Sequence, residues 1–357
     1  MKKFFIFLCS FLIFAIIASQ VMEYIQFQES FKNQPALTIS SPEERTISIS
    51  ISAVGDCFFG ADEKYAGAGD FNDVIAQNGN DYSYCFKNVK EYFEADDFTI
   101  VNYEGCISDK GVRADKEFAF RTNPDYVKFL TESSVEVANL SNNHSRDYGE
   151  ASFEDTKNIL TENGIINFAG SDVAIAEKDG IRIGFVGTNT QRYSGKEEVI
   201  QNINLLKEEN VDLLIAVFHW GDEREALPNE EQIDLAHTAI DNGADLVLGH
   251  HPHVLQGIES YNGKYIVYSL GNFSFGGIKN PYDKDTMIFN QVFYFRDGKL
   301  LDIDNASIIP CSMTSAERGN NYQPTPLFGD EFTRVKEKII ERSKDFEGIH
   351  SIRFIEG

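Results

Sequence analysis

From residue 46 onward, short apolar or β-branched runs alternate with longer stretches in which apolar residues recur at helical spacing. The clearest short run, ISISISAV at residues 47–54, alternates apolar and polar positions as a half-buried strand does. Strands are also predicted within DDFTIVNYE, VEVANLSNNH, IRIGFVGT, VDLLIAVFHWG, ADLVLGHHPH and KYIVYSLGNF. The stretches between them predict helices in PDYVKFLTESS, EASFEDTKNILTENG, EEVIQNINLLKEEN and EEQIDLAHTAIDNG. Strands that alternate with helices indicate βαβ units and a largely parallel sheet.

The C-terminal third has a different pattern. The stretch TMIFNQVFYFRDGKLLDIDNASIIP predicts two antiparallel strands joined by a tight turn at Asp297-Gly298. Gly164 and Gly243 follow two of the predicted helices and suit C-terminal caps. A last amphipathic helix is expected at residues 330–343. The fold class predicted from these patterns is α/β, with mixed sheets flanked by helices.

The N-terminal residues predict a membrane segment. Two lysines precede an apolar run from Phe4 to Ala18, close to the roughly 20 residues that span a bilayer. The lysines favour a cytoplasmic N-terminus, so we expect a single-pass anchor in residues 1–27 and an extracellular C-terminal domain. A cleaved signal peptide is the alternative, although the bulky Ile16 stands where a cleavage site before residue 19 needs a small residue.

Three further segments complete the expected organisation. Residues 28–45 are polar, contain two prolines and predict a linker. Residues 46–345 are expected to form the folded domain, and residues 346–357 a tail.

The net charge of the chain limits the classes of partner that it can bind. The chain has 32 basic and 56 acidic residues, hence a net charge of 32 − 56 = −24. Such a surface repels nucleic acid, which we exclude as a partner. It also repels an anionic polymer or phosphoester unless bound cations screen the site. Cations are therefore a condition of either substrate class.

Polar side chains follow the predicted strands at the point where each strand ends. Ligands of open α/β sheets bind outside the carboxyl ends of the strands, so these side chains are expected to meet. They are Asp56, Asn102, Glu104, Asn142, Asn143, His144, His219, Asp222, Glu223, His250, His251, His253 and Asn272. Each one alone has a structural explanation, as a turn, a cap or a buried histidine. Together they predict a metal site, because imidazoles and carboxylates bind Zn, Mn and Fe.

Other chemistries have little support. The chain lacks a phosphate-binding G-x-x-x-x-G-K-[ST] loop, a G-x-G-x-x-G after a strand, an H-E-x-x-H helix motif and a G-x-S-x-G turn. The spacing of Cys57, Cys85, Cys106 and Cys311 matches no zinc pattern. Free buried cysteines are expected, with a disulfide as the open alternative.

Six motifs in order resemble one known family. AVGDCFFG, VNYEGCI, LSNNHSRDYG, FHWGDE, GHHPHVLQGIE and YSLGNFSFG, within residues 46–326, are similar to the CapA-type poly-γ-glutamate capsule synthesis family of the calcineurin-like metallophosphoesterase superfamily. The resemblance implies a four-layer α/β sandwich with one or two divalent ions, Mn, Zn or Fe, at the strand ends. It implies as metal ligands Asp56, Glu104, Asn143, His219, His251 and His253. It implies His144 as the catalytic residue, with supporting positions at Asn102, Glu223, His250 and Asn272.

The resemblance also has a departure. The superfamily opens with D-x-H, where this chain has Asp56-Cys57-Phe58. Phe58 cannot bind a metal, so one of the two sites would lack a ligand. Cys57 is an alternative soft ligand, but its side chain should point away from that of Asp56. His250 could replace His251 in the ligand set.

The predicted function is that of a membrane-anchored extracellular protein of capsule synthesis with a metal-dependent phosphoesterase-type hydrolase site. The alternative is a non-catalytic assembly or export factor whose metal pocket is structural. An extracellular nucleotidase is a third reading, without an evident substrate domain. The expected partners are the cell membrane, an anionic capsule polymer or phosphoester substrate, and a membrane polymer synthase complex.

Overall fold

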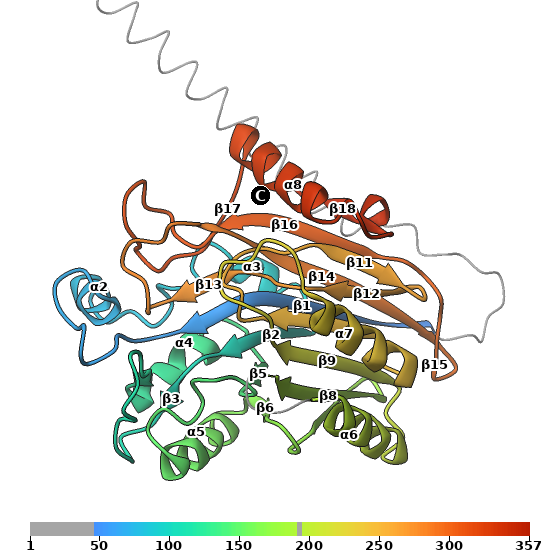
Figure 1. Cartoon of the computed structure of the whole chain (residues 1–357), viewed down its shortest axis with the longest axis horizontal. Helices are drawn as coiled ribbons and strands as arrows, with labels where there is room; N and C mark the ends of the chain where they lie inside the picture. The colour runs from blue at the N-terminus through green and yellow to red at the C-terminus, as the bar shows by residue number, and fades with distance from the viewer. Residues whose placement is uncertain (1–45, 191–194) are drawn as a thin grey trace, which may run out of the picture. The chain divides into compact units, whose positions relative to one another are not determined.

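Two β-sheets pack face to face, and helices cover their outer faces (Figure 1). The computed structural model describes residues 46–190 and 195–357. The predicted anchor and linker lie outside these residues. Within the described ranges, no helix is both long enough and apolar enough to cross a bilayer.

The larger sheet has ten strands built around β1. Its main path runs in the order β17 (Thr325–Pro326), β16 (Ala306–Ser312), β14 (Asp285–Arg296), β1 (Thr46–Phe58), β2 (Phe98–Tyr103), β5 (Val137–Asn139) and β6 (Ile166–Phe168). Off this path, β13 pairs with β1, β15 with β14 and β18 with β16; they span Asn272–Phe275, Lys299–Leu300 and Arg353–Phe354. From β1 to β6 the strands are parallel, whereas β14 is antiparallel to both neighbours. The sheet is therefore mixed, as predicted.

The smaller sheet has six strands and a parallel centre. Its order is β11 (Ile258–Tyr261), β12 (Lys264–Val267), β10 (Leu246–His250), β9 (Leu213–His219), β8 (Ile181–Asn189) and β7 (Ala174–Lys178). The two edge strands are antiparallel to their neighbours. A separate pair is formed by β3 (Cys106–Ile107) and β4 (Arg121–Thr122).

The helices divide between the two sheets. On the larger sheet lie α2 (Phe71–Gln77), α3 (Lys90–Phe93), η1 (Pro124–Val127), α4 (Lys128–Thr131) and α5 (Glu150–Glu162). On the smaller sheet lie α6 (Lys196–Glu208) and α7 (Glu230–Asn242). The C-terminal part contains α8 (Gly329–Arg342), which contacts β16, and η2 (Ile349–Ser351).

The alternation in β1 explains the layers. Ile49 and Ile51 point into the apolar core shared by the two sheets, whereas Val54 belongs to the core under the helices of the larger sheet. Phe98 of β2 and Phe185 of β8 meet across the central core, with ring centroids 6.5 Å apart. Burial of both sheet faces excludes water from the interior and holds the strand ends in fixed positions.

Acidic residues bind the starts of the parallel strands. Four carboxylates each accept a hydrogen bond from a backbone N–H of the neighbouring strand. The pairs are Asp97 with Ser50 (2.9 Å), Glu136 with Thr99 (2.8 Å), Asp212 with Arg182 (2.8 Å) and Asp245 with Leu214 (3.0 Å). Part of the acidic excess thus serves the fold at the edge opposite the predicted site.

The turn predictions can be compared directly with the structure. Asp297 and Gly298 both have positive φ, 51° and 72°, as the predicted hairpin turn requires. The second strand is split, however, because β15 ends at Leu300 and β16 resumes the pairing with β14 at Ala306. Residues 346–357, expected as a tail, contain η2 and β18. The four described cysteines are free and buried.

Candidate metal centre

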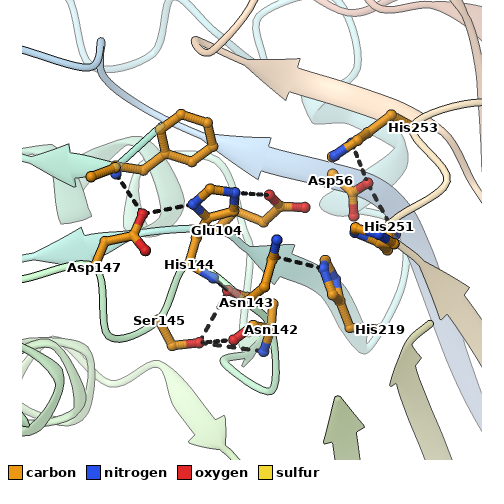
Figure 2. A network of polar contacts seen from close by, with 12 residues as sticks. Asp56, Glu104, Asn142, Asn143, His144, Ser145, Asp147, His219, His251 and His253 are labelled. Carbon is orange, nitrogen blue, oxygen red and sulfur yellow. Dashed lines mark hydrogen bonds and ion pairs between the residues drawn. The ribbon is translucent and has the colours of Figure 1, made fainter. Parts of the chain in front are cut away.

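The ends of β1, β2, β9 and β10 meet at one edge of the two sheets, together with the loop after β5 (Figure 2). In register, Asp56 of β1 pairs with Asn102 of β2, and His219 of β9 pairs with His250 of β10. Parallel pairing places these side chains at the same level of the sandwich. Segments up to about 200 residues apart therefore contribute to one site.

Asp56 lies at the centre and is fully buried. Its Oδ1 accepts hydrogen bonds from Asn102 Nδ2 (2.8 Å) and His250 Nδ1 (3.1 Å). Its Oδ2 lies 3.0 Å from His253 Nδ1. Burial opposes ionisation of Asp56, but the hydrogen bonds from the two histidines outweigh it and hold its pKa well below the ordinary value. Asp56 is a carboxylate at neutral pH.

Glu104 follows β2 and is equally buried. Its Oε2 has no hydrogen-bond partner among residues 46–190 and 195–357, and His144 Nε2 lies 3.9 Å away. Burial, and then the charge of Asp56, raise the pKa of Glu104 well above the ordinary value. Ligand atoms of Asp56, Glu104 and His253 all lie within 4.8 Å of one another. Two crowded carboxylates with an unsatisfied oxygen match the environment of a cation.

A second group of ligand-type residues lies beside the first. His219 Nε2 donates to Asn143 Oδ1 (2.9 Å), and the rings of His219 and His251 are 4.6 Å apart. Burial lowers the pKa of His219 well below the ordinary value. Burial, and then the charge of His253, lower the pKa of His251 to about 4. Both rings are therefore neutral at pH 7, the form that binds metals.

His253 has the opposite charge state. Burial disfavours its cation, but the charges of Glu104 and Asp56 outweigh burial and raise its pKa to about 10. Its Nδ1 also donates to Asn272 Oδ1 (2.9 Å). The proton on His253 thus compensates part of the negative charge that a bound cation would otherwise compensate.

The donor set fits divalent cations. Two carboxylates, three imidazoles and one amide oxygen are the ligands that Zn, Mn and Fe accept. Asp56, Glu104 and His253 could hold one ion, and Asn143, His219 and His251 a second. The orphaned Glu104 oxygen is the structural observation that favours occupancy.

His144 lies next to these groups and is held by its own contacts. Its Nδ1 donates to Asp147 Oδ2 (2.6 Å), so its Nε2 faces Glu104. Asp147 also accepts from Lys116 Nζ (2.6 Å) and from the backbone N–H of Phe120 (2.7 Å). Burial lowers the pKa of His144, although Asp147 acts against this shift. The Asp147 contact selects one tautomer and one orientation of the ring.

Asparagines fix the loop that carries His144. Asn142 Nδ2 donates to the carbonyl of Tyr103 (2.7 Å), and Asn142 Oδ1 accepts from the His144 backbone N–H (3.1 Å). Asn139 Nδ2 donates to Asn102 Oδ1 (3.0 Å), which directs the amide of Asn102 toward Asp56. The amides thus connect the loop after β5 to the ends of β1 and β2.

Phe58 occupies the position at which a D-x-H motif has its histidine. Its ring is fully buried and stacks on Phe120, with centroids 4.4 Å apart. Phe120 stacks in turn on His144, with centroids 4.0 Å apart. Phe275 and Met313 complete this apolar cluster. In this chain Phe58 therefore supports one face of the His144 ring through Phe120.

Comparison with known proteins agrees with these features. The sequence profile described as "Bacterial capsule synthesis protein PGA_cap" matches residues 50–277, which is more than half of the chain. The chain belongs to this PGA_cap family. The match includes every predicted ligand.

Members of the family and one solved structure show the range of similarity. The PGA biosynthesis protein CapA of Bacillus subtilis is 33% identical over 261 residues, 66% of each chain. The capsule biosynthesis protein CapA of Bacillus anthracis is 29% identical over 256 residues, 64% of this chain and 60% of that protein. The matched region thus spans slightly less than two thirds of these relatives. Sulfate thiohydrolase SoxB of Thermus thermophilus has a TM-score of 0.40 and 12% identity, over 83% of this chain and 61% of that one.

In this PGA_cap protein the predicted ligands and His144 gather in one place, and three of the four supporting positions contact them. Asn102 and His250 bond to Asp56, and Asn272 bonds to His253. Glu223 is exposed, and its charge bears on Glu104 and His253 without a direct contact. Cys57 bonds to the carbonyl of Gly55 and lies in the core under the helices.

Two residues that hold His144 were not among those predicted from the sequence. Asp147 stands three positions after His144, a spacing that allows contact across a tight turn, and this was its only signal. Lys116 comes from the loop between β3 and β4, 28 residues before His144, and no pattern in the sequence indicates that the two residues meet.

Proposed function

We propose that this protein is a metal-dependent hydrolase or transferase of the phosphoester type that acts in the synthesis of a bacterial capsule polymer. One observation carries the catalytic part: the buried group of Asp56, Glu104 and His253 has an unsatisfied carboxylate oxygen 3.9 Å from Nε2 of His144. A metal-ligating group beside a tautomer-fixed histidine is the arrangement that phosphoryl displacement needs.

Each residue has a role in this chemistry. A divalent ion, when bound, supplies positive charge that polarises a phosphoryl oxygen and makes a water more acidic. Asp56 and Glu104 provide the negative ligands, and neutral His219 and His251 add donors without further charge. His144 keeps Nδ1–H on Asp147, so its Nε2 lone pair faces the metal-ligating group; once Nε2 has taken up a proton from water, the imidazolium can pass that proton to the leaving oxygen.

The capsule context rests on family membership and on the names of the two Bacillus relatives. The net charge of −24 supports a cation-dependent approach of any anionic polymer to the site. We also propose that the apolar run at residues 4–18 anchors the chain, with the folded domain outside the cell beside a membrane polymer synthase. The sequence of that run supports this proposal.

The test uses the full chain purified in detergent. It is freed of metal, reloaded with Mn²⁺ or Zn²⁺, and assayed with bis(p-nitrophenyl) phosphate and p-nitrophenyl phosphate. The variants are Asp56→Ala and His144→Ala, with Arg353→Gln as a surface control whose side chain bonds to Asn305. Elemental analysis of the same samples gives the metal content.

The two variants should separate binding from catalysis. We expect His144→Ala to keep its metal and lose at least about 100-fold in rate, because general acid catalysis contributes about 10²–10⁴-fold. Asp56→Ala should lose both metal and activity. A wild type that binds metal but cleaves neither ester would instead support the non-catalytic assembly role.

A further inference from the structure

An arginine lies against the loop that carries two of the predicted ligands. Arg224 belongs to the segment that follows β9, and its backbone N–H donates to the carbonyl of Pro252 (2.8 Å). Pro252 stands between His251 and His253 in sequence. Arg224 has a φ of 68°, a left-handed conformation that costs energy for a side chain other than glycine. Strain of this kind persists where the surrounding structure holds it, often at functional sites.

The guanidinium of Arg224 is accessible. Arg224 is exposed, and its Cζ lies 4.9 Å from the ring centroid of Tyr282, which is 58% exposed. An aromatic ring behind a guanidinium orients its plane while leaving its N–H groups to other partners. The pair thus forms an ordered cationic surface beside the ligand loop.

Arg224 differs from two cations around His144 in having no carboxylate partner. Lys116 pairs with Asp147, and Arg113 pairs with Asp62. Among residues 46–190 and 195–357, no carboxylate lies within ion-pair distance of the Arg224 side chain. Its five N–H donors are available to an external anion.

The negative charge of the neighbouring residues indicates a role for Arg224. The neighbouring Glu223 adds to the negative field on Glu104 and His253. An anionic substrate that approaches the centre would meet this field before it reached the ligands. A fixed guanidinium at the same loop offsets the field and offers a planar fork that matches phosphate or carboxylate.

We propose that Arg224, supported by Tyr282, binds the anionic group of the substrate beside the loop that carries His251 and His253. The group is a phosphate or a carboxylate, which a guanidinium recognises through the same paired N–H contacts. This inference rests on the proposed function, since it assigns the substrate contact of the same site. Arg224 is a binding residue whose effect falls on affinity.

Calorimetric titration of the Mn²⁺-loaded full chain in detergent tests the proposal without turnover. Inorganic phosphate and a γ-glutamyl tripeptide are the two probes, and the stronger of the two identifies the anion source. Arg224→Gln should weaken binding of that probe at least about 10-fold, and Arg224→Lys by less, because lysine keeps the charge but not the fork. Tyr282→Ala, which leaves the Arg224 backbone unaltered, should weaken it about threefold. Metal content and the melting temperature should not change, and Arg353→Gln should bind as wild type does.

Steady-state kinetics supply a second measurement. With p-nitrophenyl phosphate, Arg224→Gln should raise KM about 10-fold and leave kcat within about twofold. If the wild type binds a probe but hydrolyses neither ester, the proposed function fails while the calorimetric result still supports the role of Arg224. Unchanged affinity in Arg224→Gln, an equal loss in Arg353→Gln, or no binding of either probe to the wild type would overturn the inference.

Discussion

Replacement of Glu104 by glutamine should stabilise the metal-free protein and remove its response to metal. Glu104 is fully buried, its Oε2 has no hydrogen-bond partner among the described residues, and Asp56 lies beside it. Without a cation, this carboxyl must either stay charged in an apolar interior or take up a proton at neutral pH. Both states cost free energy that a neutral amide of the same shape avoids.

The magnitude follows from the burial. An unsatisfied buried polar group costs about 1–3 kcal/mol and a charged one costs more, so we expect the exchange of this carboxyl for a neutral amide in Glu104→Gln to gain about 2 kcal/mol in the metal-free state. For a domain of this size that gain raises the melting temperature by about 4 °C. A cation at about 100 times its Kd stabilises the wild type by about 2.7 kcal/mol, whereas the variant lacks a charged ligand and should gain much less. The order of the two melting temperatures should therefore reverse when metal is added.

Thermal unfolding with EDTA and then with Mn²⁺ measures both states. Asp285→Asn provides a matched comparison, since Asp285 is also buried but accepts a fork of hydrogen bonds from Arg334 (2.7 and 2.8 Å). Asp285 is thus a paired carboxylate, and its neutralisation should cost about 1–2 kcal/mol in both conditions. If Glu104→Gln lowers the metal-free melting temperature as Asp285→Asn does, then Glu104 is structurally satisfied and our argument for a cation fails.

Two further predictions concern His144 and the opposite edge of the sheet. Asp147→Asn should lower kcat about 10²–10⁴-fold with unchanged metal content, because His144 loses the charged acceptor that selects its tautomer; a loss of metal would show that Asp147 acts on the ligands instead. Burial raises the pKa of Glu136 from 4.5 to about 7, so the folded state binds a proton between these values and stability falls as pH rises through this window. Glu136→Gln should therefore gain stability relative to wild type from pH 5 to pH 8 in urea unfolding, and a constant difference would contradict the raised pKa.

The sequence predicted the strands well because their periodicity records burial directly. β1 alternates, and the core strands of the smaller sheet are continuously apolar, since both of their faces are covered. The meeting of the strand-end side chains could be predicted for a related reason, as parallel strands deliver their carboxyl ends to one edge. The break in the second strand of the C-terminal hairpin could not be predicted, because apolar residues on both sides conceal the interruption of regular pairing between Leu300 and Ala306.

The contacts that hold His144 were less predictable because they depend on loop conformation. The Asp147 contact requires the turn in which the Asp147 N–H bonds to the His144 carbonyl (3.1 Å). The Lys116 contact requires the loop between β3 and β4 to fold back over that turn. Neither condition leaves a periodic pattern in the chain. Side chains on loops can therefore be assigned only after the fold brings the loops together.

Phe58 shows how a missing ligand can serve the same site in another way. A histidine at this position would add a donor for a cation, whereas the phenylalanine adds a ring that fixes Phe120 and, through it, one face of His144. The hydrogen bond that His144 Nδ1 donates to Asp147 fixes the orientation of the same imidazole within its plane. On the proposed function, the first ion would be held by Asp56, Glu104 and His253, and the unsatisfied oxygen of Glu104 favours a cation there through its charge. The proposed function then implies that the chain exchanges one ligand for a more firmly held His144.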